Sequence, residues 1–185
     1  DMLVRFERWR VPRDKAMHDD AQLLRDYCKG KSEAAFDELV RRHVDLVHST
    51  ALRLVHGDTH LAEDVTQDVF ADLARRATAL LGRPSLAGWL YTATRFAAAK
   101  QVRSEQRRRA REQEPQFMET TNFPDPDWTQ LQPHLEDAMH ELNEPDREAV
   151  ILRYFQSQPF KQVAAALRTT EDAARMRVDR AVDKL

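Results

Sequence analysis

The sequence predicts an all-α protein made of two small helical domains that are joined by an acidic, flexible linker. Three observations support this fold class. Charged residues make up 32% of the 185 residues, glycine occurs only four times, and good helix formers are abundant. Apolar residues recur at spacings of three and four, which is the period of an amphipathic helix. A polar, acidic segment separates two such apolar patterns.

The first predicted domain, residues 19–111, is a bundle of about four helices. Apolar residues at positions 23, 24 and 27 indicate a short helix that ends near Gly30. The pattern over 34–55 indicates a longer helix, and apolar residues at 61, 65, 69 and 73 indicate a third. After a loop at 80–88, a fourth helix is expected to run to about Arg111.

The predicted linker, residues 112–131, is rich in acids and prolines and has neither lysine nor arginine. Residues 132–185 form the second predicted domain, in which Pro145 marks a helix start. A helix of about eight residues near its end is followed by a polar break at 168–170. A second helix follows, with Thr170 as its N-cap and an apolar face at 174, 178, 181 and 185. These proportions match a helix-turn-helix.

The two ends of the chain predict a longer native protein. Met17 would make a natural start, so residues 1–16 are expected to be a leader or foreign to the native chain, within a segment 1–18 that precedes the first domain. Leu185 stops in mid-pattern. No apolar run has membrane-spanning length. The single cysteine, Cys28, excludes an intrachain disulfide and fits a reducing cytosol.

A stripe of basic residues covers the end of the fourth predicted helix. Residues 95–111 carry seven arginines or lysines and one acid, a density that could neutralise several phosphates. The alternative is an ordinary solvated helix end. Tyr91 and Phe96 lie before and within this stripe and could stack on unpaired bases, whereas Trp89 is expected in the core.

Three carboxylates, Asp64, Asp68 and Asp72, follow one another at steps of four on the third predicted helix. Metal or acid-base chemistry would need converging partners, and the nearby His56 and His60 lie in a turn. Nucleophile motifs, glycine-rich phosphate loops and CxxC pairs are absent from the sequence. We therefore expect no catalytic residues, no metal, no cofactor and no enzymatic activity.

The order of three motifs resembles one known family. The motifs are "LAEDVTQDVFADLARR", "GWLYTATR" leading into the basic helix, and the closing "LNEPDREAVILRYFQSQPFKQVAAALRTTEDAARMRVDRAVDKL". Together they are similar to bacterial RNA polymerase sigma factors of the extracytoplasmic-function (ECF) type of the sigma-70 family, over nearly the whole chain. The resemblance implies a cytoplasmic subunit that binds core RNA polymerase and directs promoter-specific initiation. Its implied partners are the clamp helices and flap of the polymerase, promoter DNA and an anti-sigma factor.

The resemblance also implies site residues. Polymerase binding would fall to Asp64, Gln67, Asp68 and Phe70. The minus-ten element, opened with a flipped base held by the loop 80–88, would contact Arg83, Tyr91, Arg95, Phe96, Lys100, Arg103 and Arg107. The minus-thirty-five duplex would contact Arg168, Thr170, Arg175, Met176, Arg177, Asp179 and Arg180.

The sequence departs from the family pattern at two places. Phe96 and Lys100 stand where the family often has asparagine and a second small polar residue. Arg168 replaces the usual turn glycine, and Thr169 replaces a usual apolar residue.

Two other functions fit parts of the sequence. A free-standing helix-turn-helix regulator would use the first bundle as a sensor or dimerisation domain and would bind duplex DNA without polymerase. A helical adaptor would bind only protein. The ordered docking motif on the third predicted helix separates the sigma-factor hypothesis from both.

Overall fold

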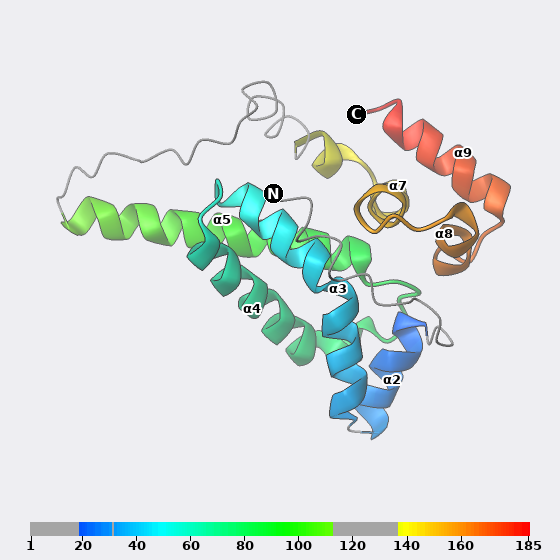
Figure 1. Cartoon of the computed structure of the whole chain (residues 1–185), viewed down its shortest axis with the longest axis horizontal. Coiled ribbons are helices and arrows are strands. Elements are labelled where there is room, and N and C mark those ends of the chain that lie inside the picture. Colours follow the sequence, from blue (N-terminus) through cyan, green and yellow to red (C-terminus); the bar gives the residue numbers. More distant parts are fainter. Residues whose placement is uncertain (1–18, 31, 113–136) are drawn as a thin grey trace, which may run out of the picture.

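The computed structural model describes residues 19–30, 32–112 and 137–185. Within these ranges every regular element is helical, which confirms the all-α prediction (Figure 1). The predicted N-terminal segment, 1–18, and all but the first residue of the predicted linker, 112–131, lie outside the described residues. No helix in the described part of the chain is long and apolar enough to cross a membrane.

The N-terminal domain contains α2 (Asp20–Gly30), α3 (Glu33–Leu54), α4 (Thr59–Arg76), the short 3-10 helix η1 (Ala77–Leu80) and α5 (Ala87–Glu112). Helices α3, α4 and α5 pack against one another, and α2 packs on α3. Polar caps set two helix starts, because the Ser32 hydroxyl accepts a hydrogen bond from the Ala35 N–H at 3.3 Å and the Asp58 carboxylate accepts one from Leu61 at 3.0 Å.

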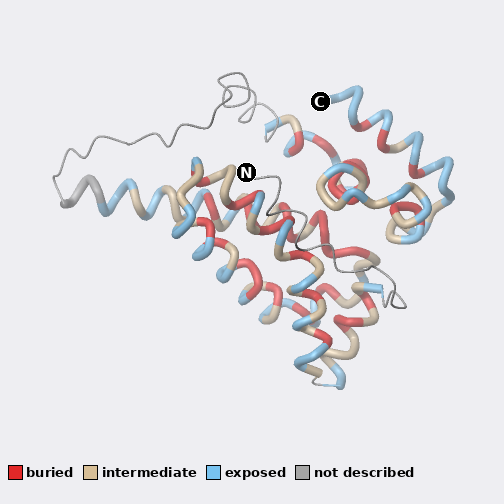
Figure 2. The backbone as a smooth tube through the Cα atoms, in the orientation of Figure 1, coloured by how far each residue is buried: buried red, intermediate tan, exposed pale blue. Residues whose placement is uncertain are grey.

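The apolar spacing seen in the sequence becomes the core of this domain. The buried stripes of α3, α4 and α5 face inward (Figure 2). Val65, Val69 and Leu73 of α4 are at most 1% exposed and pack in the same cluster as Leu39 and Leu90. Trp89, expected in the core, is half-buried and packs against it. The bundle of about four helices is therefore present as the sequence predicts.

The C-terminal domain begins with a helical turn at 137–141 and continues with α7 (Glu144–Val150), the π-helical segment η2 (Ile151–Phe155), α8 (Phe160–Ala166) and α9 (Glu171–Val182). Pro145 lies in the first turn of α7, and the Asn143 side chain caps it through the Asp146 N–H at 2.9 Å. The apolar face predicted for the last helix is buried at Ala174, Val178 and Ala181. It is wrong at Leu185, which lies beyond the end of α9 and is 43% exposed.

The two domains contact each other directly. The N-terminal half of α5 packs against α7 and η2, and Leu46, Ala87 and Tyr91 share a buried cluster with residues of the C-terminal domain such as Met139 and Ile151. We call this interface the domain contact. It was not predicted from the sequence.

Candidate nucleic-acid interface

The predicted polymerase-binding residues of α4 divide into an exposed group and a buried one. Asp64, Gln67 and Asp68 are exposed, and Asp68 accepts a hydrogen bond from Gln101 of α5 at 3.2 Å. Phe70 is only 8% exposed and belongs to the core of the N-terminal domain. Its position is that of a packing residue, because it follows Val69 on the inward side of the helix. The structure therefore presents two carboxylates and an amide, without the ring, on this face.

The third acid of the row has local partners. Asp72 pairs with Arg75 at 3.4 Å and with Arg76 at 2.9 Å, one turn further along α4. These are helix-surface ion pairs, which contribute little stability but reduce the local negative charge. Among the described residues no group of His, Cys, Asp or Glu side chains could hold a metal ion.

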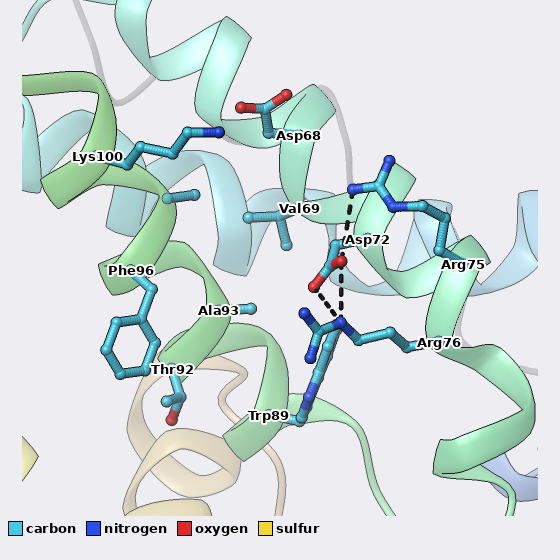
Figure 3. A pocket seen from close by; sticks show the side chains of 11 residues that line it. Asp68, Val69, Asp72, Arg75, Arg76, Trp89, Thr92, Ala93, Phe96 and Lys100 are labelled. Carbon is cyan, nitrogen blue, oxygen red and sulfur yellow. Dashed lines mark hydrogen bonds and ion pairs between the residues drawn. The ribbon is translucent and has the colours of Figure 1, made fainter. Parts of the chain in front are cut away.

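A groove of about 480 Å³ runs between α4 and α5 (Figure 3). Asp68, Val69 and Asp72 line it from α4, and Phe96 and Lys100 line it from α5. Phe96 is 67% exposed, which is unusual for a phenyl ring and leaves its face open to a stacking partner. The groove therefore combines an open aromatic ring with charges of both signs.

The rest of the basic stripe on α5 also lies on the surface. Lys100, Arg103 and Arg107 are exposed along one long helix, and the Arg103 Nε donates to the Ala99 carbonyl at 3.0 Å. Arg95 differs from these three residues. It is half-buried and lies 3.6 Å from the Asp137 carboxylate of the C-terminal domain.

The domain contact involves three of the predicted minus-ten residues. Arg83 forms an ion pair with Glu144 at the start of α7, and Arg95 pairs with Asp137 as above. Tyr91 is 1% exposed, and its ring meets the ring of Phe155 edge-on with the centroids 6.1 Å apart. Tyr91, a predicted minus-ten contact, is therefore buried under η2 in this arrangement of the domains.

Further contacts make the domain contact specific. The Arg53 guanidinium lies 5.1 Å from the centroid of the Phe155 ring, and Arg147 of α7 donates to the Thr92 hydroxyl at 3.3 Å. The Gln156 amide meets His43 Nδ1 at 3.0 Å. Aromatic, charged and amide groups of the C-terminal domain thus contact both α3 and the first turns of α5.

Glu148 is a buried carboxyl within the domain contact. It lies against Gly88, where an added Cβ would come within 3.3 Å of the Glu148 Cβ. Burial raises the pKa of Glu148, and Glu144 adds to this effect, while hydrogen bonds from Ser85 and the Gly88 N–H and the charge of Arg83 oppose it. Its Oε1 has no hydrogen-bond partner among the described residues. Glycine at position 88 permits the close approach that buries this carboxyl.

The loop 80–88 is held in place by residues of α2 and α3. The Leu86 N–H donates to Asp20 Oδ2 at 3.1 Å, and the same oxygen meets His43 Nε2 at 3.0 Å. Burial opposes ionisation of Asp20, but His43, the Leu86 amide and Arg42 outweigh it, so the pKa of Asp20 lies below its usual value. The loop predicted to hold a flipped base is therefore tied to α2 and α3.

The helix-turn-helix presents the predicted minus-thirty-five residues as a surface. The Thr170 hydroxyl caps α9 through the Ala173 N–H at 3.2 Å. On α9 itself, Arg177 is half-buried at the edge of the apolar face, and four residues are exposed: Arg175, Met176, Asp179 and Arg180. Met176 is 61% exposed.

Arg168 ends α8 in a left-handed conformation. Its φ is 52°, the region that glycine adopts without strain. The turn geometry expected from the family's glycine is therefore retained, with an arginine in its place. Arg168 and Thr170 are both exposed beside the start of α9.

One feature of this surface was missed in the sequence. Phe160, the first residue of α8, lies close to two guanidinium groups, with its ring centroid 4.6 Å from Arg153 Cζ and 4.8 Å from Arg175 Cζ. The three residues belong to three separate helical segments, so the period of a single helix does not link them.

Comparison with known proteins identifies the two domains separately. Residues 39–108 match the family described as Sigma-70 region 2, and residues 134–185 match the family described as Sigma-70, region 4. Both families belong to one class of transcription factors, and together the two matches cover more than half of the chain. They fall in the same order as the two helical domains of the structure.

Two relatives extend the similarity across the linker. The chain is 29% identical over 155 residues to "RNA polymerase sigma factor CarQ" of Myxococcus xanthus, covering 83% of this chain and 88% of that protein. It is 30% identical over 158 residues to "ECF RNA polymerase sigma factor SigE" of Mycolicibacterium smegmatis, covering 82% of this chain and 60% of that protein.

Solved structures show more distant similarity. A complex of the sigma factor RpoE with the anti-sigma factor NepR from Bartonella quintana matches 80% of this chain and 92% of its own, with 22% identity and a TM-score of 0.42. A complex of CnrH with the cytosolic domain of CnrY matches 89% and 93%, with 19% identity and a TM-score of 0.41. From the two family matches and the sequence relatives, the chain belongs to the sigma-70 family, as a sigma factor of the ECF type.

Proposed function

We propose that this chain binds core RNA polymerase through α4, recognises the minus-ten element with α5 and the loop 80–88, and recognises the minus-thirty-five element with α9. It directs promoter-specific initiation and has no catalytic chemistry of its own. It acts in the cytoplasm, where polymerase and promoter DNA are found. The observation that carries the proposal is the pairing of an exposed acidic face on α4 with an exposed helix-turn-helix surface on α9 in one chain.

The polymerase-binding face is supported by the exposure and charge of its side chains. Asp64 and Asp68 are exposed on α4. Exposed carboxylates one turn apart are suited to a basic protein surface, where complementary charge accelerates association. We propose that Asp64, Gln67 and Asp68 dock on the clamp helices of the polymerase.

The promoter-binding surfaces are supported by exposure and charge. Phe96, Lys100, Arg103 and Arg107 form an open row on α5, suited to stacking on a base and to neutralising phosphates. On α9, arginine side chains of a helix that enters the major groove can form paired hydrogen bonds with a base edge. The regulation of this chain by an anti-sigma factor stays a prediction.

The domain contact opens when both promoter elements are bound. Elements centred about 25 base pairs apart are separated by roughly 85 Å of B-form DNA. Two small domains in direct contact do not span that distance, and the contact also buries Tyr91 and pairs Arg83 and Arg95 with acids of the C-terminal domain. We propose that binding to polymerase holds the domains apart, so that these three residues become available to the minus-ten element.

The test of this function uses the purified chain, core polymerase and a library of promoters. The wild type is expected to bind core and to direct transcription from a defined promoter. Asp64→Arg combined with Asp68→Arg should weaken core binding at least about tenfold, since both charges would then repel a basic surface. Asp37→Arg is the matched control, because Asp37 is an exposed helical aspartate on α3. A wild-type chain that binds DNA but not core would instead support the free-standing regulator.

A further inference from the structure

Phe160 connects three elements of the C-terminal domain through its ring. It is the first residue of α8, Arg153 comes from η2, and Arg175 comes from α9. Both guanidinium carbons lie within 5 Å of the ring centroid, at 4.6 Å for Arg153 and 4.8 Å for Arg175. These distances are within the range of a cation–π interaction. The ring therefore fixes the position of an arginine that the exposed face of α9 presents to DNA.

A second contact restrains each guanidinium group. Arg153 Nη1 donates to the Gln158 carbonyl at 3.1 Å. Arg175 Nη2 lies 4.0 Å from Glu171 Oε1, one turn earlier on α9. The Arg175 side chain is still 57% exposed. It thus lies against the Phe160 ring, with the Glu171 carboxylate nearby, while part of its hydrogen-bonding fork faces solvent.

This arrangement matters because a free arginine on a helix surface samples many rotamers. Only one particular rotamer can form two parallel hydrogen bonds with a base. Ordering the side chain in that rotamer beforehand therefore reduces the entropy lost on binding. The base whose major-groove edge matches an arginine fork is guanine, through O6 and N7. A leucine at position 160 could fill the same space but has no π face.

We propose that Phe160 is a positioning residue for promoter specificity: its ring orients Arg175 to read a guanine in the minus-thirty-five element. Phe160 acts through Arg175 and makes no base contact itself. The inference rests on the proposed function, because it requires that α9 enters the major groove. Beyond the proposed function, it names Phe160 as the residue that orients Arg175 and guanine as the base that Arg175 selects.

The test uses holoenzyme reconstituted from core polymerase and the full chain, with a promoter library randomised in the minus-thirty-five element and sequenced transcripts as the readout. The wild type should select guanine at one position. Arg175→Ala and Phe160→Leu should both relax selection at that same position, Arg175→Ala by about tenfold or more and Phe160→Leu by about three- to tenfold. Phe160→Tyr should retain it, since tyrosine keeps the π face.

A double-mutant cycle separates positioning from packing. Phe160→Leu should have little further effect on guanine selection once Arg175 is alanine, whereas its effect should add to that of Arg180→Ala. Full guanine selection by Phe160→Leu would overturn the inference. So would an equal loss of selection at every position, since that would indicate a purely structural role.

The outcomes also distinguish this inference from the function on which it rests. A wild-type holoenzyme that transcribes from no promoter would overturn both. A holoenzyme that shows minus-thirty-five selection, but selects no guanine through Arg175 or is unaffected at that position by Phe160→Leu, would overturn the inference alone. The salt dependence of DNA binding should be the same for Phe160→Leu and the wild type, because no phosphate contact is removed.

Discussion

Replacing Phe155 by alanine should open the domain contact. The Phe155 ring makes its two aromatic contacts with the other domain, edge-on to Tyr91 at 6.1 Å and beneath the Arg53 guanidinium at 5.1 Å. An aromatic pair of this kind contributes about 0.5–1.5 kcal/mol, a cation–π contact near the surface about 0.5–1 kcal/mol, and burial of a half-buried phenyl group about 1 kcal/mol.

Together these contributions amount to about 2–3.5 kcal/mol of the free energy difference between the closed and open arrangements. The ratio of open to closed molecules should therefore rise about 30- to 370-fold in Phe155→Ala. Small-angle scattering of the full chain should report a larger radius of gyration, and hydrogen exchange should increase in the segment around Tyr91, which loses its cover. Circular dichroism should show unchanged helical content.

The neighbouring aromatic residue provides the control. Tyr154 is also in η2, but it is 58% exposed, so Tyr154→Ala should leave the radius of gyration and the exchange around Tyr91 as in the wild type. The reasoning would be refuted if Phe155→Ala were as compact and as protected as the wild type. It would also be refuted if both variants opened equally, because the effect would then not depend on the ring in the contact.

Three further predictions concern stability. Arg168→Gly should raise the free energy of unfolding of the C-terminal domain by about 0.5–1 kcal/mol, because it relieves the strain of a positive φ; Arg168→Ala should not, and thermal unfolding measures both. Asp20→Asn should lower the free energy of unfolding of the N-terminal domain by about 3 kcal/mol. In the wild type, the stability of this domain should fall as the pH drops below 3.8, the usual pKa of an aspartate, because the pKa of Asp20 is lowered in the folded state. The raised pKa of Glu148 has the opposite effect on the pH dependence. The domain contact should weaken as the pH rises from 4.5, the usual glutamate pKa, through the raised pKa of Glu148. Glu148→Gln should remove this pH dependence, which small-angle scattering measured against pH would show.

The sequence predicted the elements whose signals are local. Apolar residues four apart placed α4, and a threonine followed by two acids placed the start of α9, because a cap and a periodic stripe depend on near neighbours. The resemblance to a family pointed to the turn at Arg168, where the structure has the left-handed conformation.

The remaining features depend on residues far apart in the chain. Tyr91 suits either a core or a DNA surface, and the packing of distant residues such as Met139, Ile151 and Phe155 decides that it is buried. Phe70 follows Val69 on α4, at the edge of the apolar stripe. The spacing of apolar residues did not show whether a side chain at this edge is buried or exposed, and the structure buries it. The π-helical turn η2 arises where α7 continues without a break, and no residue type marks it in advance. The assignments of individual residues to polymerase and promoter stay predictions.

His43 contacts polar groups of both domains. Its Nε2 meets Asp20, which also accepts the Leu86 amide of the loop 80–88, and its Nδ1 meets the Gln156 amide of the C-terminal domain. His43 Nε2 donates to the ionised Asp20 carboxylate, so one ring contacts both the anchor of the loop and the C-terminal domain. Separation of the domains removes the Gln156 contact and leaves His43 and Asp20 free to shift. By thermodynamic reciprocity, a base captured by the loop should change the ease with which the domains separate.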